Sequence, residues 1–151
     1  MPKNLQEDLT MEWTRSLPRT VGITIDTGTR IHAEPLERGR IGVRSIEYGT
    51  ETTSVPGEVL PKKENWLLKI AELFSLSGVM FVLHNLRPGI QSSGLGGSAT
   101  ATTGVCILAN ELAGRSMSGV QLVSMASRLE QDYGVSITGT QEQSNVVFGG
   151  V

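Results

Sequence analysis

Residues 92–100 read Ser-Ser-Gly-Leu-Gly-Gly-Ser-Ala-Thr, and they stand directly before a run with helical spacing. Three glycines within four residues let successive backbone N–H groups converge on one point. The start of a helix adds a partial positive charge and unpaired N–H donors at the same place. We therefore expect a phosphate cradle that needs no lysine. The alternative is a flexible loop in which Ser98 is the N-cap of the helix.

The surrounding sequence distinguishes this loop from two common phosphate-binding motifs. A Walker loop needs Gly-Lys-Ser/Thr, but between residues 88 and 151 the only bases are Arg115 and Arg128. A dinucleotide fingerprint needs a third glycine at the position where this chain has Ala99. The small residues at 99–104 would let the helix start lie close to a bulky anion or to a neighbouring strand.

Two helices are predicted after the loop. Helical spacing covers residues 98–113, with Gly114 as the stop. The second helix follows a capping box of Ser118 and Gln121 and is expected to end at Gly134. The predicted apolar seams are Ala101, Val105, Leu108 and Leu112 in the first helix and Leu122, Val123, Ala126 and Leu129 in the second. A polar loop then leads into residues 146–150, Val-Val-Phe-Gly-Gly, where we expect a strand.

Strands dominate the residues before the loop. Three short runs at 20–26, 30–35 and 41–47, separated by tight turns, predict an antiparallel meander followed by a polar loop. Residues 62–77 predict a helix that stops at Gly78, and residues 79–84 predict a buried strand. The apolar stripe of that helix is Trp66, Leu67, Ile70, Leu73 and Phe74. This mixture favours the α+β class over a doubly wound parallel sheet.

The composition limits the classes of function. The chain has 151 residues, which is one domain by length, and 13 basic against 15 acidic residues. This balance, without a basic stripe, argues against nucleic acid as a partner. No apolar run reaches the roughly 20 residues of a membrane span, and because residues 1–8 are polar and acidic we do not expect them to be a signal peptide. The single cysteine, Cys106, fits a cytoplasmic location and is expected to be a small buried hydrophobe.

Acidic residues near the end of the second helix and beyond it are candidates for chemistry. Glu130 and Asp132 lie at the unfavourable negative end of the helix dipole, and Glu142 follows in a loop rich in hydrogen-bonding side chains. One acid could hold Mg²⁺ while another acts as a base or orienting carboxylate. The alternative is that Glu130 is a solvated helix-end residue paired with Arg128. The two histidines, His32 and His84, are too few for a His-rich zinc site and favour a structural role.

Two motifs together resemble the GHMP small-molecule kinase family. They are Gly-Leu-Gly-Gly-Ser-Ala at 94–99 and, after Glu130, Gly-Thr-Gln-Glu-Gln at 139–143 with Phe-Gly-Gly at 148–150. The second motif looks most like the sugar branch, the heptose-phosphate and fucose kinases. The resemblance covers roughly residues 20–151. It implies the α+β fold of the second domain of a ribosomal small-subunit protein, with a left-handed β-α-β unit and an antiparallel sheet packed on helices.

The resemblance also implies roles for individual residues. Ser98 would coordinate Mg²⁺, Glu130 would be the second metal ligand, and Glu142 would act as the base or orient the acceptor hydroxyl. The residues that would contact the triphosphate of ATP are Ser93, Gly94, Leu95, Gly96, Gly97, Ser98 and Ala99. The implied reaction transfers the γ-phosphoryl group of ATP to a hydroxyl of a small sugar or sugar phosphate.

The chain departs from the family pattern in three places. Gly97 replaces the first serine of the family motif, and Glu142 replaces an aspartate, which adds a methylene. Residues 1–19 match no family segment and are expected to be a loose lead-in. Residues 20–151 are then expected to be part of a GHMP N-terminal domain, without the C-terminal domain and with exposed surface that favours a homo-oligomer.

Two other interpretations stay open at this stage. One is a non-catalytic descendant of the family that binds nucleotide or sugar phosphate. The other is a structural α+β domain related to the ribosomal protein, which the acidic balance disfavours.

Overall fold

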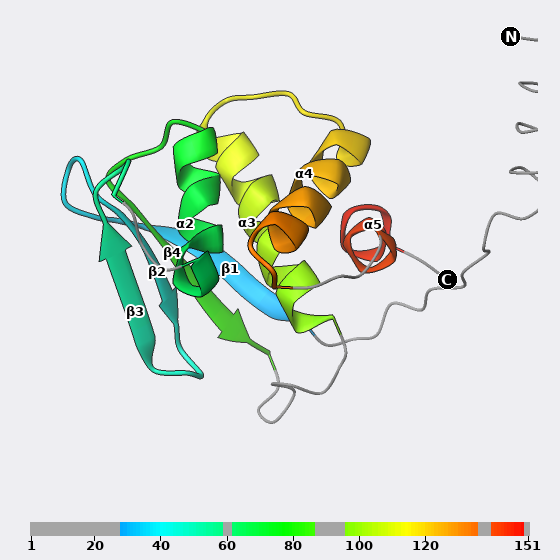
Figure 1. Ribbon diagram of the computed structural model, residues 1–151, viewed down its shortest axis with the longest axis horizontal. Helices are drawn as coiled ribbons and strands as arrows, with labels where there is room; N and C mark the ends of the chain where they lie inside the picture. The colour runs from blue at the N-terminus through cyan, green and yellow to red at the C-terminus, as the bar shows by residue number, and fades with distance from the viewer. Residues whose placement is uncertain (1–27, 59–61, 87–95, 136–139, 150–151) are drawn as a thin grey trace, which may run out of the picture.

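The computed structural model describes residues 28–58, 62–86, 96–135 and 140–149 (Figure 1). Within these residues a sheet is covered on one face by helices, with α2 and α3 next to the sheet and α4 and α5 farther out (Figure 1). The elements in chain order are β1 (Thr29–Pro35), β2 (Ile41–Ser45), β3 (Thr50–Ser54), α2 (Lys62–Leu73), β4 (Val79–Asn85), α3 (Gly97–Leu112), α4 (Gly119–Asp132) and α5 (Gln141–Phe148). The α+β class is confirmed.

The sheet has the strand order β1-β4-β2-β3. β4 pairs antiparallel with β1 and parallel with β2, placing Val79 opposite Pro35 on one side and Ile41 on the other. The predicted meander is therefore wrong in its pairing, because β4 separates the two strands predicted at 30–35 and 41–47. The first predicted strand, 20–26, lies outside the described residues. The left-handed β-α-β unit stays a prediction.

The hairpin partner of β2 is β3, which the sequence analysis assigned to a polar loop. Its residues read Thr-Glu-Thr-Thr-Ser, and they pair antiparallel with β2 from Thr50 opposite Ser45 to Ser54 opposite Ile41. Only Ser54 of this strand is buried. A strand that pairs on one side and faces water needs few apolar residues, so hydrophobic patterning does not reveal it.

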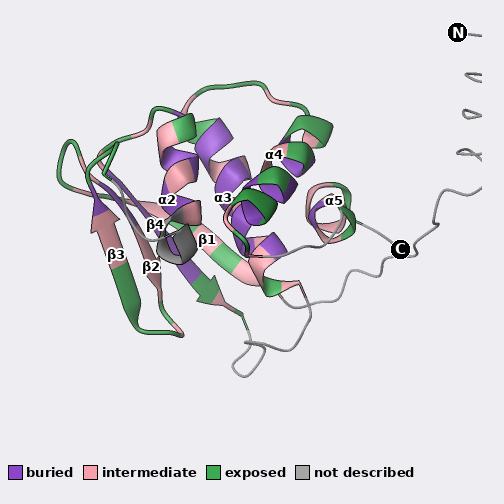
Figure 2. Cartoon of the chain, viewed as in Figure 1, coloured by how far each residue is buried: buried purple, intermediate pink, exposed green. Residues whose placement is uncertain are grey.

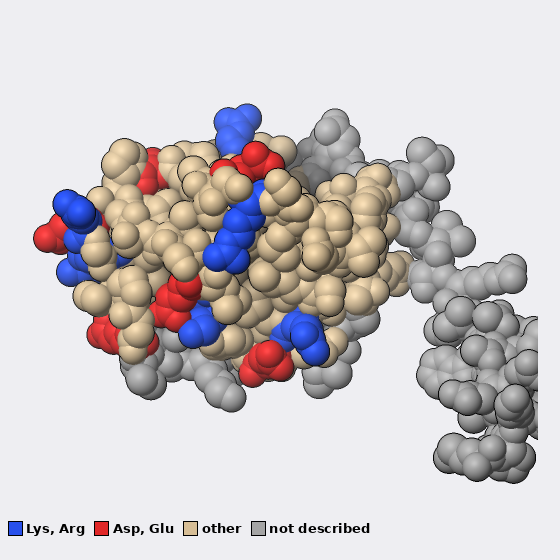
Figure 3. Space-filling view, turned by 90° about the horizontal axis from the view of Figure 1, so that it is seen from above, with Lys and Arg blue, Asp and Glu red and all other residues tan. Residues whose placement is uncertain are grey.

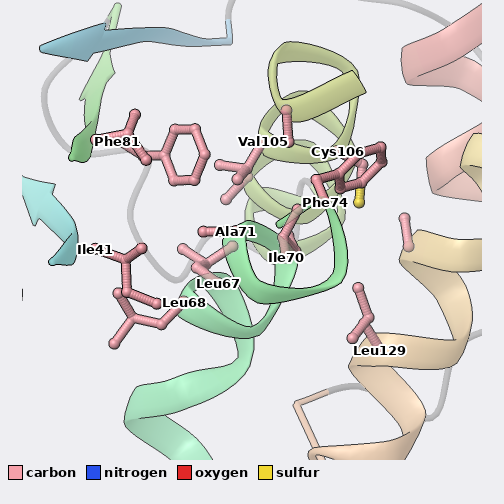
Figure 4. Close-up of a cluster of buried hydrophobic side chains, with 14 of the residues drawn as sticks. Ile41, Leu67, Leu68, Ile70, Ala71, Phe74, Phe81, Val105, Cys106 and Leu129 are labelled. Carbon is pink, nitrogen blue, oxygen red and sulfur yellow. The ribbon is translucent and has the colours of Figure 1, made fainter. Parts of the chain in front are cut away.

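The main core lies between the sheet and the first helix layer. Phe81 and Ile41 of the sheet, Leu68 and Ile70 of α2, and Val105 of α3 are all fully buried, and Figure 4 shows their side chains pointing into the same space. A second contact layer joins α3 to α4, where Leu122, Val123, Ala126 and Leu129 are buried as predicted. Figure 2 shows buried segments, in purple, on the sides of α3 and α4 that face each other.

α3 approaches the sheet closely at Gly104. A β-carbon placed there would lie 2.5 Å from Cδ1 of Ile31 in β1, closer than any real contact of that kind. The buried seam of α3 consists of small residues, including Ala99, Ala101, Thr102 and Ala109. The predicted seam is right for Ala101 and Val105 but wrong for Leu112, which is exposed. Small side chains therefore fix how near the helix lies to the strands.

Two of the three predicted helix stops are confirmed. Gly114 and Gly134 follow α3 and α4 with φ of 62° and 65°, as glycine stops should. α2 ends earlier than predicted: the left-handed residue is Ser75 with φ of 57°, and Leu76 N–H donates to the Ala71 carbonyl at 2.8 Å. Gly78 instead donates its N–H to the Arg40 carbonyl and lies directly before β4.

The strand predicted at residues 146–150 is wrong. Residues 141–148 form α5, with Ser144 N–H donating to the Thr140 carbonyl at 2.9 Å. The β-branched pair Val146 and Val147 favours a strand locally, but packing of the segment against α3 and α4 decides for a helix.

Two surface properties bear on function. Figure 3 shows basic and acidic side chains interspersed on the face seen from above, with no gathering of one sign. Within the described ranges, no helix has both the length and the apolar character that a membrane span requires.

Candidate phosphate and metal site

α3 begins at a glycine rather than at a polar capping side chain. Gly96 is the N-cap, with φ 74° and ψ 29°, and no side chain caps the helix. The Gly96 carbonyl accepts the first helical hydrogen bond from Thr100 N–H at 2.9 Å. The prediction that Ser98 could be the N-cap is wrong, because Ser98 lies inside the first turn. The first-turn N–H groups, which have no intrahelical acceptor, receive no side-chain cap.

Glu142 lies against this helix start. It occupies the first turn of α5, not a loop as predicted, and is half-buried. A β-carbon built on Gly96 would stand 3.3 Å from Cδ and 3.4 Å from Oε2 of Glu142. Gly96 therefore provides both the left-handed turn and the room for this carboxylate. The structure brings together two residues that the sequence analysis had placed in one site.

Glu130 is buried in the last turn of α4, with 1% of its surface exposed. The solvated interpretation is therefore wrong. The proposed pairing with Arg128 is absent as well: Arg128 is exposed, and no ion pair of the described residues includes Glu130. Asp132 is exposed and stands apart from Glu130 in this respect. A buried carboxylate without a cationic partner is costly unless hydrogen bonds or a metal compensate it.

Neutral hydrogen-bonding groups surround the Glu130 carboxylate. The Gln143 amide Nε2 donates to Oε2, and Thr102 Oγ1 lies 3.3 Å from Oε1. Thr102 Oγ1 is also 2.8 Å from the Ser98 carbonyl and accepts from the indole Nε1 of Trp66 at 2.8 Å. Thr102 and Gln143 are fully buried. Through Thr102, the carboxylate therefore lies one helical turn from Ser98 at the start of α3.

The Glu130 carboxylate also affects the pKa of Cys106. Burial, together with the negative charge of Glu130, raises the pKa of the Cys106 thiol to about 12. The thiol is consequently neutral at physiological pH and packs in the core, as predicted. A nucleophilic role is disfavoured.

The histidines lie on the sheet and not in this site. His32 Nε2 is 3.3 Å from Glu34 Oε1, and His84 Nε2 is 3.5 Å from Glu47 Oε1. Both imidazoles are about half exposed. In the part of the chain that the structure describes, no group of three or more His, Cys, Asp or Glu side chains could hold a metal ion.

The donor set at Glu130 nevertheless suits a hard cation. A carboxylate and a hydroxyl supply oxygen ligands, which Mg²⁺ prefers, and Mg²⁺ commonly uses only one or two protein ligands with substrate phosphates and water. The uncompensated charge of buried Glu130 is the observation that favours a cation here.

Of the remaining residues predicted to contact ATP, two are described by the structure and three are not. Gly97 is exposed at the first position of α3, and Ala99 is buried against the core. Ser93, Gly94 and Leu95 lie outside the described residues.

Sequence reasoning missed Thr102, Gln143 and Trp66. Thr102 follows Ser98 by one helical turn, and Gln143 adjoins Glu142, so spacing could have nominated both. The link from α2 through Trp66 had no signal in the sequence, because it depends on how α2 and α3 pack.

Comparisons with known proteins give the family and the fold of the chain. The family profile described as the N-terminal domain of GHMP kinases matches residues 65–150, which is more than half of the chain. No curated protein sequence matches the chain.

Several solved structures share the fold. Galactokinase of Lactococcus lactis, complexed with galactose, superposes with a TM-score of 0.68 at 16% identity over 96% of this chain and 47% of its own. The D-glycero-D-manno-heptose 1-phosphate kinase of Bacteroides thetaiotaomicron gives 0.62 at 22% identity over 85% and 44%. A Campylobacter jejuni protein described as a proposed sugar kinase gives 0.70 at 21% identity over 85% and 43%. The chain spans less than half the length of each.

Proposed function

Because this chain belongs to the GHMP kinase family, we propose that it provides the nucleotide-binding part of an ATP-dependent kinase acting on a hydroxyl of a small sugar or sugar phosphate. The observation that carries the proposal is the buried Glu130 carboxylate, one turn from Ser98 and without an ion-pair partner in the described residues. The sugar substrate class is suggested by the galactokinase and heptose 1-phosphate kinase among its structural neighbours.

The start of α3 would bind the phosphates of ATP. Its first-turn N–H groups and the positive end of the helix dipole favour an anion, and the N-cap, Gly96, has no side chain that could compete for them. In this proposal Gly96, Gly97, Ser98 and Ala99 contact the triphosphate from the helix, and Ser93, Gly94 and Leu95 contact it from the preceding loop. Gly97 presents open space where a β-carbon would stand, which leaves access for a phosphate.

Ser98 and Glu130 would hold Mg²⁺. When bound, Mg²⁺ neutralises charge on the phosphate oxygens during transfer, the contribution that lysine makes in other phosphate-binding loops. Within the chain, Ser98 supplies a hydroxyl from the first turn of α3, and Glu130 supplies a carboxylate that burial keeps away from bulk water. The two proposed ligands come from different helices, Ser98 from α3 and Glu130 from α4. The spacing of these helices therefore sets the distance between the two ligands.

Glu142 would act on the acceptor. Its carboxylate lies beside Gly96, so it stands at the phosphate-binding end of α3. From there it would orient the sugar hydroxyl and accept its proton as the oxygen attacks the γ-phosphorus in line. Its extra methylene relative to the family aspartate is accommodated against a residue that has no side chain.

Two measurements test the proposal. Isothermal titration of the chain with Mg²⁺–ATP should release or absorb heat, and no signal would refute the nucleotide role. Transfer of radiolabelled γ-phosphate should then be assayed with a panel of hexoses, heptoses and their phosphates. A chain that binds Mg²⁺–ATP but phosphorylates no sugar would support the non-catalytic alternative.

Glu142→Gln tests the proposed proton acceptor. General-base catalysis contributes about 10²–10⁴-fold, so turnover should fall by that order while Mg²⁺–ATP affinity is retained. Asp132→Asn is the matched control, because it removes an exposed carboxylate at the end of α4 and should change neither quantity. Unchanged turnover in Glu142→Gln would remove Glu142 from the reaction.

A further inference from the structure

The two oxygens of the Glu130 carboxylate are held differently. Oε2 accepts a hydrogen bond from the amide nitrogen of Gln143 on α5. Oε1 lies 3.3 Å from the hydroxyl oxygen of Thr102 on α3, which is beyond the usual O–H···O distance. Glu130 and Gln143 have essentially no exposed surface, so water does not make up the difference. One oxygen is therefore anchored more firmly than the other.

The position of the Thr102 hydroxyl hydrogen makes the two carboxylate oxygens of Glu130 differ further. The indole of Trp66 can only donate, so the Thr102 oxygen is the acceptor of their 2.8 Å hydrogen bond. The single hydroxyl hydrogen of Thr102 then has two candidate acceptors, the Ser98 carbonyl at 2.8 Å and Glu130 Oε1 at 3.3 Å. The shorter contact with Ser98 is favoured. Oε1 is consequently the carboxylate oxygen with unused capacity to bind a cation.

Gln143 is also not explained by packing. Its Oε1 is buried without a hydrogen-bond partner in the residues that the structure describes. Leaving a buried acceptor unpaired is unfavourable, and an apolar side chain of the same length would avoid that cost. The amide nitrogen, which faces Glu130, is the feature that an apolar residue could not supply.

We propose that Gln143 and Thr102 are positioning residues for Glu130: Gln143 anchors Oε2, and Thr102, held by Trp66, leaves Oε1 directed to a divalent cation. The inference rests on the proposed Mg²⁺ site and deepens it. It connects all four described helices, because Trp66, Thr102, Glu130 and Gln143 come from α2, α3, α4 and α5 in turn. α5 thus presents two neighbouring residues to the site, Glu142 to the helix start and Gln143 to the buried carboxylate.

Three variants test the inference. Thr102→Val removes the hydroxyl at nearly constant shape, Gln143→Met removes the amide, and Thr102→Ser keeps the hydroxyl. Changes to groups that orient a metal ligand cost about 10–100-fold in metal affinity. We expect the Mg²⁺ concentration for half-maximal turnover to rise by that factor in Thr102→Val and Gln143→Met, with a smaller change in kcat. Thr102→Ser should remain within about threefold of the unchanged chain.

A second readout does not require turnover. Mg²⁺ added with ATP should raise the midpoint of thermal unfolding, and the concentration dependence of that rise gives the affinity. The curve should move to higher Mg²⁺ in Thr102→Val and Gln143→Met and stay in place in Thr102→Ser. If Gln143→Met does not fold, Gln143→Asn, which withdraws the amide by one methylene, replaces it with the same expectation.

Thr103→Val is the matched control. Thr103 is the next residue of α3, is equally buried, and its hydroxyl has no hydrogen-bond partner among the described residues. Its removal should leave the Mg²⁺ dependence unchanged. The inference is overturned if Thr102→Val and Gln143→Met show the Mg²⁺ dependence of the unchanged chain while Glu130→Gln loses it. If Glu130→Gln has no effect either, the inference and the proposed Mg²⁺ site both fail.

Discussion

α3 and α4 begin in opposite ways. At α4 the Ser118 hydroxyl accepts from Gln121 N–H at 3.4 Å, and the Gln121 side chain accepts from Ser118 N–H at 2.8 Å, so the helix start is closed by its own residues. At α3 the N-cap is Gly96, which has no side chain to offer. Capping by Ser, Thr, Asp or Asn typically stabilises a helix by about 1 kcal/mol. α4 uses that stabilisation, whereas α3 forgoes it, which leaves its first-turn N–H groups for the phosphate in our proposal.

The same contrast holds for the surroundings of the two starts. Neither helix has an acidic residue in its first turn. At α3, however, an acid arrives from elsewhere in the chain, because Glu142 of α5 lies against Gly96. At α4 the residues of α5 near the start are apolar: a β-carbon on Gly119 would collide with Phe148 at 2.7 Å. The start of α4 is thus packed against apolar residues, whereas the start of α3 lies beside a carboxylate and belongs to the proposed site.

The largest effect should come from Gly96→Ala. A β-carbon there combines left-handed strain of about 1–2 kcal/mol with an approach to Glu142 that the carboxylate must yield to. A displacement near 1 Å costs about 10²-fold in rate, and the Glu142 carboxylate has to yield by less than that, so we expect turnover to fall by at least about tenfold but by less than 10²-fold. Gly134→Ala is the control, since φ is 65° and nothing lies within 4 Å of the added carbon. It should lower thermal stability similarly and leave turnover intact; equal losses of turnover would remove the distinction between the two sites.

A smaller effect is expected from Gly97→Asp, which gives α3 an acid at its start. The free chain should gain about 0.3–1 kcal/mol in unfolding free energy from the helix dipole. Mg²⁺–ATP should bind roughly tenfold more weakly, because like charges at about 4 Å repel by up to about 4 kcal/mol in a partly screened site. Gly97→Asn has the same size without the charge and should retain affinity. Calorimetry and thermal unfolding measure both quantities, and an Asp variant that binds as tightly as the Asn variant would contradict an anion site.

The smallest effect on Mg²⁺–ATP binding should follow from removing the side-chain cap at the start of α4. Ser118→Ala removes the capping hydroxyl of α4 and should cost about 1 kcal/mol, a fall of roughly 2–4 °C in the unfolding midpoint. Mg²⁺–ATP affinity should stay within about twofold, since the α4 start is separate from the proposed site. A loss of affinity comparable to that of Gly97→Asp would show that the two helix starts are coupled.

α4, whose start is closed by its own capping box, was also easier to predict from the sequence than α3. The Ser118–Gln121 box, the apolar stripe of α4 and the stop at Gly134 depend on neighbours in the sequence, and all three are confirmed. β3 was missed because an edge strand needs few apolar residues, and α5 was mistaken for a strand because its Val-Val-Phe run has β propensity that packing overrides.

At the proposed site, the sequence could nominate residues but not their environment. Glu130 looks solvated in the sequence, since acids at helix ends usually are, and only the packing of α3, α4 and α5 buries it. The motifs at 94–99 and 139–143 nominated Gly96 and Glu142, which the structure places in contact. The roles of Thr102 and Gln143 depend on hydrogen bonds between residues far apart in the chain, which no local pattern records.

The close approach of α3 to β1 at Gly104 also affects where the start of the helix lies. Gly104 faces Ile31 of β1, and the helix start at Gly97 is about 10 Å away along the axis at 1.5 Å per residue. A β-carbon at Gly104 would press on Cδ1 of Ile31, so either that side chain turns aside or the helix shifts, and a shift of the helix would also move its start. The position of the helix start therefore depends in part on a residue about two turns away from the proposed site, and a substitution at Gly104 could alter that site without lying in it.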